Sequence, residues 1–402
     1  MEKYFQMKID KYIEWMPSQT IFRCFIYWIV IGVTFFCSST TAKAQLNPTF
    51  KGYLKNLSGV NFTSDFKDPQ WNNIVHNRIE STWKLTTNLQ LQADLRARLF
   101  TGYTVNNFHE YGTYLASDGG FVDLSRNLIE TQRMIFNVQS DRLHLSYELN
   151  SLEINVGRQR LNWGKSMVWN PNDLFNNYAY LDFDYEERPG TDAIHVQYSW
   201  SFASSIDVGI KLADRYDQAV YAAMLRSNIG TYDVQLIGGK YEDEFVIGGG
   251  WSGYLKNAGF KGEMSMFFDD QLKNKYLNAS LGADYMLSNG FYLSGEILYN
   301  GGYDQDSNEI KGLTDPPKAT NLFIAETGYF LNVSNSISPL VNASLGILGS
   351  TSESIYIFIP QTSISISEDI DVLILAQLAS GSLMKSYTTH TNAVYFRVKL
   401  SF

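Results

Sequence analysis

The chain is poor in cysteine. Its 402 residues include two cysteines, Cys24 and Cys37, and both lie within the first 44 residues. The chain from residue 45 onward therefore has no disulfide framework, no cysteine zinc site and no thiol nucleophile.

Positive charge is also scarce. The sequence has 32 Lys and Arg against 41 Asp and Glu, which gives a formal net charge of -9 at pH 7. Proteins that bind nucleic acids carry a basic patch or stripe, and this chain has none. We therefore expect no nucleic-acid partner.

Long apolar runs are missing beyond the N-terminus. The run at residues 24–36 follows four basic residues and is shorter than the roughly 20 residues that a membrane helix needs. The small residues of "SSTTAKA" behind it complete the pattern of a secretory signal peptide that is cleaved after Ala44. We expect a signal peptide at residues 1–44 and one domain at residues 45–402.

Catalytic signatures are absent as well. None of the five histidines has H-E-x-x-H spacing, and no G-x-S-x-G motif occurs. Two pairs, His144 with Ser146 and His195 with Ser199, share a strand face, but any alternating polar face produces such pairs. The acidic stretches 182–187 and 303–309 lack the spacing of a calcium-binding EF-hand loop. We expect no enzyme activity, no metal and no cofactor.

What the chain does have is alternation. The last ten residues, "AVYFRVKLSF", place Phe396, Val398, Leu400 and Phe402 on one face and polar residues on the other. Such alternation fits the mean hydropathy of -0.19, and the 15% of aromatic residues fits the interfacial girdles of a membrane barrel. The terminal Phe402 resembles the C-terminal signature by which bacterial outer-membrane barrels are recognised for assembly. This resemblance implies the barrel-assembly machinery and outer-membrane lipids as partners.

Eighteen alternating segments follow one another along the chain. They span residues 49–62, 73–85, 89–102, 132–149, 152–163, 192–200, 205–212, 218–228, 232–240, 244–255, 260–268, 276–287, 291–299, 321–333, 340–348, 354–366, 370–378 and 393–402. Short turns alternate with longer links such as 101–131, 164–191, 301–320 and 380–392. The sequence therefore predicts an all-β, transmembrane, antiparallel up-and-down β-barrel of about 18 strands, or 16 if two short segments merge, with short periplasmic turns and long extracellular loops.

Alternation assigns the polar side chains to the barrel lumen. Unpaired charges are too costly in lipid, so they face water or one another. These charges either pair across strands and stiffen the wall, or form a field that selects among solutes. The predicted pore-lining residues are Arg78, Glu80, Lys84, Asp94, Arg96, Arg98, Arg142, His144, Glu148, Arg158 and Arg160. Further candidates on the same face include Glu263 and Glu296.

The stretch "VGRQRLNWG", followed by "NPND" and "RPG", resembles porin-like outer-membrane families of the alginate-export type. The resemblance implies a pore with an inward-reaching loop and arginines that set selectivity. The predicted constriction loop includes Trp163, Lys165, Trp169, Asp173, Asp182, Asp184, Glu186, Glu187 and Arg188. Either its aromatic side chains offer a face for sugars or other amphipathic solutes, or the loop is a lid packed on neighbouring loops.

Alternation from Ile154 and Val156 would direct Arg158 and Arg160 towards lipid. We predict that a bulge or a strand end near Gly157 turns at least one of these arginines inward. Its expected partners are carboxylates such as Glu148, Asp173 or Glu187.

Together these features predict a porin-like channel in the outer membrane of a Gram-negative cell, where small polar solutes diffuse passively through a charged lumen. Two alternatives stay open. One is a barrel enzyme that acts on lipid or envelope polymer, and the other is a non-conducting structural or surface-binding barrel.

Overall fold

The computed structural model describes residues 48–62, 66–177, 189–269, 271, 275–303, 318–383 and 387–402. The predicted signal peptide lies outside these residues. So do five residues of the predicted constriction loop, and most of the acidic stretch 303–309. The five are Asp182, Asp184, Glu186, Glu187 and Arg188.

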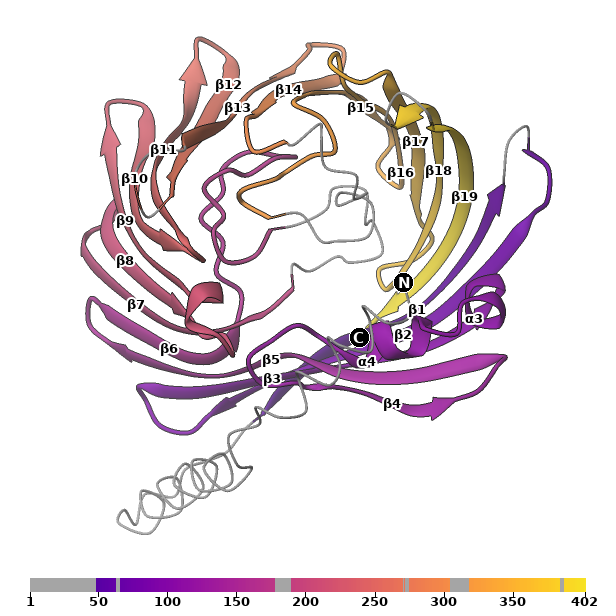
Figure 1. Ribbon diagram of the computed structural model, residues 1–402, viewed down its shortest axis with the longest axis horizontal. Helices are drawn as coiled ribbons and strands as arrows, with labels where there is room; N and C mark the ends of the chain where they lie inside the picture. Colours follow the sequence, from indigo (N-terminus) through magenta and orange to yellow (C-terminus); the bar gives the residue numbers. More distant parts are fainter. Residues whose placement is uncertain are drawn as a thin grey trace. The chain divides into compact units, whose positions relative to one another are not determined.

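The described chain forms one antiparallel sheet that closes on itself (Figure 1). Its strands are β1 (Thr49–Phe62), β2 (Gln70–Lys84), β3 (Leu89–Gly102), β4 (Ser125–Glu130), β5 (Met134–Leu149), β6 (Leu152–Gln159), β7 (Thr191–Ser201), β8 (Ser204–Lys211), β9 (Val220–Ile229), β10 (Tyr232–Tyr241), β11 (Glu244–Leu255), β12 (Ala258–Phe268), β13 (Lys275–Met286), β14 (Tyr292–Asn300), β15 (Thr327–Ser338), β16 (Val341–Gly349), β17 (Ile355–Ser365), β18 (Ile370–Leu383) and β19 (Tyr387–Ser401). Pairing of β1 with β19 closes the barrel. Because β3 pairs directly with β5 and β4 pairs only with β5, the barrel wall has 18 strands, as predicted.

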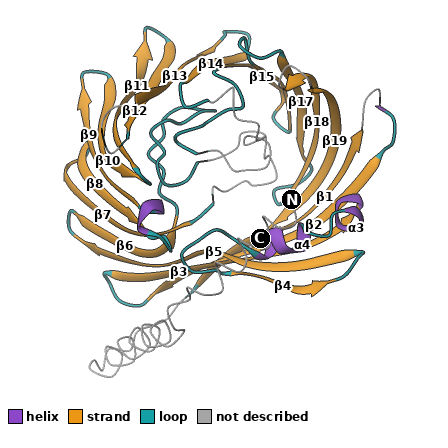
Figure 2. Cartoon of the chain, viewed as in Figure 1, coloured by secondary structure: helices purple, strands orange, loops and turns teal. Residues whose placement is uncertain are grey.

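The connections differ at the two rims. One rim has links such as 150–151, 230–231 and 256–257, whereas the other has the long links 103–133, 160–190 and 301–326. The first long link contains the short helices α3 (Tyr103–Asn107) and α4 (Tyr111–Ala116), which the sequence did not predict, and Figure 2 shows how little helix accompanies the strands. Among the described residues, no helix is long and apolar enough to span a membrane.

Side chains alternate between the two faces of the wall. On β14, Leu293, Ile297 and Tyr299 are exposed, whereas Ser294, Glu296, Leu298 and Asn300 are buried. The exposed set is apolar and forms the outer face that a bilayer requires, and the buried set points to the interior.

Several predicted strand boundaries were wrong. Strand β6 ends at Gln159 instead of residue 163, and the Gln159 amide binds the carbonyls of Asn155 and Ala193 where the ladder stops. Strand β15 begins at Thr327 instead of residue 321, because Asn300 binds the carbonyls of the preceding segment. The predicted long link 380–392 is instead mostly strand, since β18 and β19 pair as far as Leu383 and Tyr387.

Candidate functional site

The inner faces of β19, β1, β2, β3 and β5 form a surface rich in cationic side chains, which we call the basic wall. The strand register aligns its residues in rows across the sheet. One row contains Lys399, Lys55, His76 and Arg98, and the next contains Arg78 and Arg96. Arg142 lies in a third row, opposite Asp94. The structure therefore brings together four of the predicted arginines.

Carboxylates pair with part of this wall. Arg78 lies 3.0 Å from Asp94, 3.3 Å from Asp141 and 3.2 Å from Glu80. Arg96 lies 3.4 Å from the same Asp141. The register shifts between Asp94 and Leu95, so Asp141 is an extra residue in β5, and its carboxylate joins two arginines. No local pattern around Asp141 signals this bulge, so the residue was not among those predicted.

The long link 103–133 covers the part of the basic wall that contains Arg98. Arg98 donates to Asn137 at 2.9 Å and to Gln139 at 3.2 Å. Asn137 is fully buried and donates to the carbonyl of Leu115 in α4 at 2.9 Å. The long link 103–133 therefore packs on the wall through α3 and α4, above the ion pairs.

Arg158 lies in a closed ion cluster. Gly157 has a φ of +119°, a backbone conformation that favours glycine, and no register shift accompanies it. Arg158 is 4% exposed and donates to Asp192 at 2.8 Å, to Asp118 and to the carbonyl of Val122 at 2.5 Å. The arginine therefore meets carboxylates near a strand end, as predicted.

Of the two predicted alternatives, the strand end is present at Gln159 and the bulge is not. The carboxylates that bind Arg158 are Asp192 and Asp118 and not the expected Glu148 or Asp173, while Glu187 lies outside the described residues. Sequence spacing could not identify Asp118, because it lies in the preceding long link, 40 residues away. Arg160 does not share the burial of Arg158, since its side chain is exposed.

The described part of the predicted constriction loop, residues 160–177, packs against the inner wall, and we call it the inner segment (Figure 1). Trp163 packs on Phe175 with ring centroids 4.9 Å apart, and Trp169 packs on Phe323 at 5.4 Å. Both tryptophans are 4% exposed. These two tryptophans offer no free face to sugars, because apolar residues of strands between β7 and β18 pack around them. The other aromatic side chains of the predicted loop, in 178–188, lie outside the described residues.

Polar contacts hold the inner segment as well. Asn172 donates to the carbonyl of Gly249 at 2.9 Å and accepts from Ser265 at 2.8 Å. A Cβ atom at Gly248 would lie 2.8 Å from the Asn172 side chain, so glycine there gives the segment room. Asp173 is fully buried, and Lys165 is half-buried, which lowers the pKa of the Lys165 amine below its ordinary value.

The remaining predicted pore residues lie apart. Lys84 and Glu148 are exposed near the short-turn rim. His144 is half-buried, with Nδ1 3.2 Å from the carbonyl of Arg158. His195 lies 3.2 Å from Asp207, which also binds Arg226, so this histidine belongs to a charged wall cluster. No group of metal-ligating side chains occurs among the described residues.

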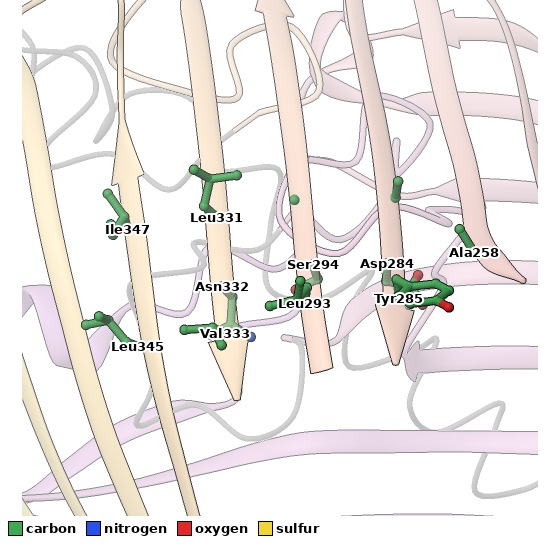
Figure 3. Close-up of a pocket in the computed structure, with 12 residues that line it drawn as sticks. Ala258, Asp284, Tyr285, Leu293, Ser294, Leu331, Asn332, Val333, Leu345 and Ile347 are labelled. Atoms are coloured by element: carbon green, nitrogen blue, oxygen red, sulfur yellow. The ribbon is translucent and has the colours of Figure 1, made fainter. Parts of the chain in front are cut away.

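A hollow of about 500 Å³ lies over β12 to β16 (Figure 3). Its lining includes the outer-face residues Leu293, Leu331 and Leu345, all of which are exposed. The hollow is mainly apolar and opens on the outer face, so it is not part of a path through the barrel.

Comparison with known proteins identifies solved structures of the same fold but no protein family. Neither a protein-family model nor a curated protein matches the sequence, so the resemblance to the alginate-export porin type is not supported. Similar solved structures include Acinetobacter baumannii OccAB4, at 10% identity and a TM-score of 0.55 over 90% of this chain and 99% of that one. Pseudomonas aeruginosa OprD is similar at 9% identity and a TM-score of 0.57 over 89% and 97%.

The Pseudomonas aeruginosa outer membrane protein OpdK is similar at 8% identity and a TM-score of 0.54, over 89% of this chain and 98% of that one. It has also been solved with vanillate, in a structure with a TM-score of 0.53 to this chain. This chain therefore has the fold of these proteins, a closed antiparallel barrel of 18 strands.

Proposed function

We propose that this chain is an outer-membrane channel through which small polar solutes diffuse passively. The observation that carries the proposal is the contrast between the two faces of the closed wall. The outer face is apolar, and the inner face of β19, β1, β2, β3 and β5 bears rows of charged side chains. A barrel that is apolar outside and charged inside suits a water-filled path across a bilayer.

The inner segment narrows this path. It packs in apolar clusters with inner-face residues of strands between β7 and β18, and it leaves the basic wall as the other side of the lumen. A solute passes between the inner segment and the basic wall, where Arg98 is half-buried, whereas Arg78 and Arg96 are buried in ion pairs beneath the surface. The charge of Arg98 favours anionic or strongly polar molecules. The structure of OpdK with vanillate supports the choice of small carboxylates as test solutes, by analogy of fold alone.

The same proposal covers targeting and assembly. Residues 1–44 act as a cleaved export signal, and the barrel-assembly machinery recognises the last strand, which ends at Phe402. The matching barrels are outer-membrane proteins at least in the case of OpdK, which supports this location. N-terminal sequencing of the protein from isolated outer membranes should begin at Gln45.

Conductance measurements test the channel. The purified chain in planar bilayers should give unitary current steps, and proteoliposomes should swell in small sugars, amino acids and organic acids including vanillate. If neither steps nor swelling occurs with folded protein, the chain is a non-conducting barrel and the proposal fails. If the protein instead hydrolyses lipid, and substitution of His144 or His195 abolishes this activity, the alternative of a barrel enzyme is favoured.

A further inference from the structure

Two glutamates on the inner wall bind the backbone of the inner segment. Glu263 of β12 accepts from the backbone N–H groups of Lys165, Ser166 at 2.5 Å and Asn172 at 3.1 Å. Glu296 of β14 accepts from Met167 at 2.8 Å, Val168 at 3.1 Å and Trp169 at 2.8 Å. Five consecutive amides and a sixth nearby are therefore satisfied by two side chains of the barrel wall.

The strand between the two glutamates adds a third contact. Ser280 of β13 is the cross-strand neighbour of Glu263, and its hydroxyl lies 2.8 Å from the hydroxyl of Ser166. The anchors thus come from three successive strands, β12, β13 and β14. The inner segment follows this line across the wall.

The partners of these two buried glutamates argue against a role in stiffening the wall alone. Glu263 is 1% exposed and Glu296 is 2% exposed. Neither forms an ion pair with a lysine or arginine of the described residues, in contrast to Asp94 and Asp141 on the basic wall. Buried charges need partners, and here the backbone amides of the inner segment supply them.

We infer that Glu263 and Glu296 are positioning residues that fix the width of the lumen by holding residues 165–172 against the wall. The inference rests on the proposed channel function. Without the two carboxylates, six amides lose their acceptors, four of them in buried residues, and water is the available replacement. Residues 165–169 then loosen from the wall and fluctuate beside the path of the solute, while the strands keep their pairing.

Hydrogen exchange measures the anchoring directly and does not depend on conduction. In the wild-type barrel, the amides of residues 165–169 should be protected like strand amides. In the Glu263→Gln and Glu296→Gln variants, they should exchange at least about tenfold faster, because charge-assisted hydrogen bonds are lost. Peptides from β12 and β14 should keep their protection, which shows that the barrel is folded.

Single-channel recording measures the consequence for the lumen. Each variant should replace the steady wild-type current with fluctuating steps of altered mean conductance, and the double variant should show the largest change. Glu153→Gln is the matched control, since it removes one carboxylate from the inner face of β6, where Glu153 contacts Asn155 and not the inner segment. Its current noise should equal that of the wild type.

The outcomes separate the two proposals. If the wild-type amides 165–169 exchange as fast as in an unfolded peptide, or if both variants keep them protected, the positioning role is overturned even though the channel conducts. If both variants release the segment but the wild type never conducts, the anchoring holds and the channel function fails. If a variant does not fold, the exchange protection of amides 165–169 in the wild type still shows whether these residues are anchored to the wall.

Discussion

Replacing Arg158 by methionine should destabilise the barrel, because it breaks a buried ion cluster. Methionine has a similar side-chain length, so the substitution mainly removes the charge. Arg158 is 4% exposed, and the side chains of its partners Asp118 and Asp192 are 1% and 8% exposed. Removal of one member of a buried pair costs about 3–5 kcal/mol, since it leaves an uncompensated charge.

The backbone reduces this cost. Asp192 keeps the N–H of Val122 at 2.9 Å, and Asp118 keeps the N–H groups of Gly120 at 3.0 Å and Leu124 at 2.9 Å. These donors continue to stabilise the carboxylates, so we expect Arg158→Met to lower the free energy of unfolding by about 2–4 kcal/mol.

Equilibrium guanidinium unfolding in lipid vesicles, followed by heat-modifiable gel mobility, measures this change. The double variant Arg158→Met/Asp192→Asn should be less destabilised than the sum of the single variants, with a coupling of about 0.5–3 kcal/mol. Arg133→Met is the matched control, because Arg133 is exposed in the same long link. An Arg158→Met variant that unfolds within about 0.5 kcal/mol of the wild type would refute the reasoning, since that is the range of ordinary surface substitutions.

Three further predictions concern the wall, the inner segment and selectivity. Gly157→Ala should cost about 1–3 kcal/mol in the same unfolding assay, because its φ is +119° and a Cβ would lie 2.3 Å from a carbonyl oxygen, whereas Gly238→Ala, with nothing within 4 Å, should be neutral. Trp169→Ala should cost about 3–5 kcal/mol through the lost contact with Phe323, and an unchanged unfolding midpoint would contradict the packing. Arg98→Glu should lower the anion-to-cation permeability ratio measured from reversal potentials in a salt gradient, and an unchanged ratio would show that the basic wall does not set selectivity.

Much of the fold follows from local pattern. The period of two in segments such as residues 393–402 depends only on which side chains tolerate lipid, so alternation predicted 18 wall strands and which residues face outward. The predicted strand boundaries were wrong where a side chain from another segment binds the backbone groups that a neighbouring strand would otherwise bind. Asn300, for example, binds the carbonyls before β15 and delays its start to Thr327.

The candidate site was predictable only in part. Alternation placed Arg78, Arg96 and Arg98 on one face of neighbouring strands, and the register confirmed that they are adjacent. It could not predict Asp141, whose position depends on a bulge, or Asp118, which reaches Arg158 from a distant link.

Alternation along the chain thus specifies the wall, a barrel whose outer face is apolar because charge is costly in lipid. Which segments fill the barrel depends on contacts between distant parts of the chain. Glu263 and Glu296 appear in the sequence as two more polar residues on inner faces. Their role depends on six backbone amides about a hundred residues away in the chain, and backbone groups carry no sequence signal. Contacts between a side chain and a distant main chain are fixed by three-dimensional packing alone.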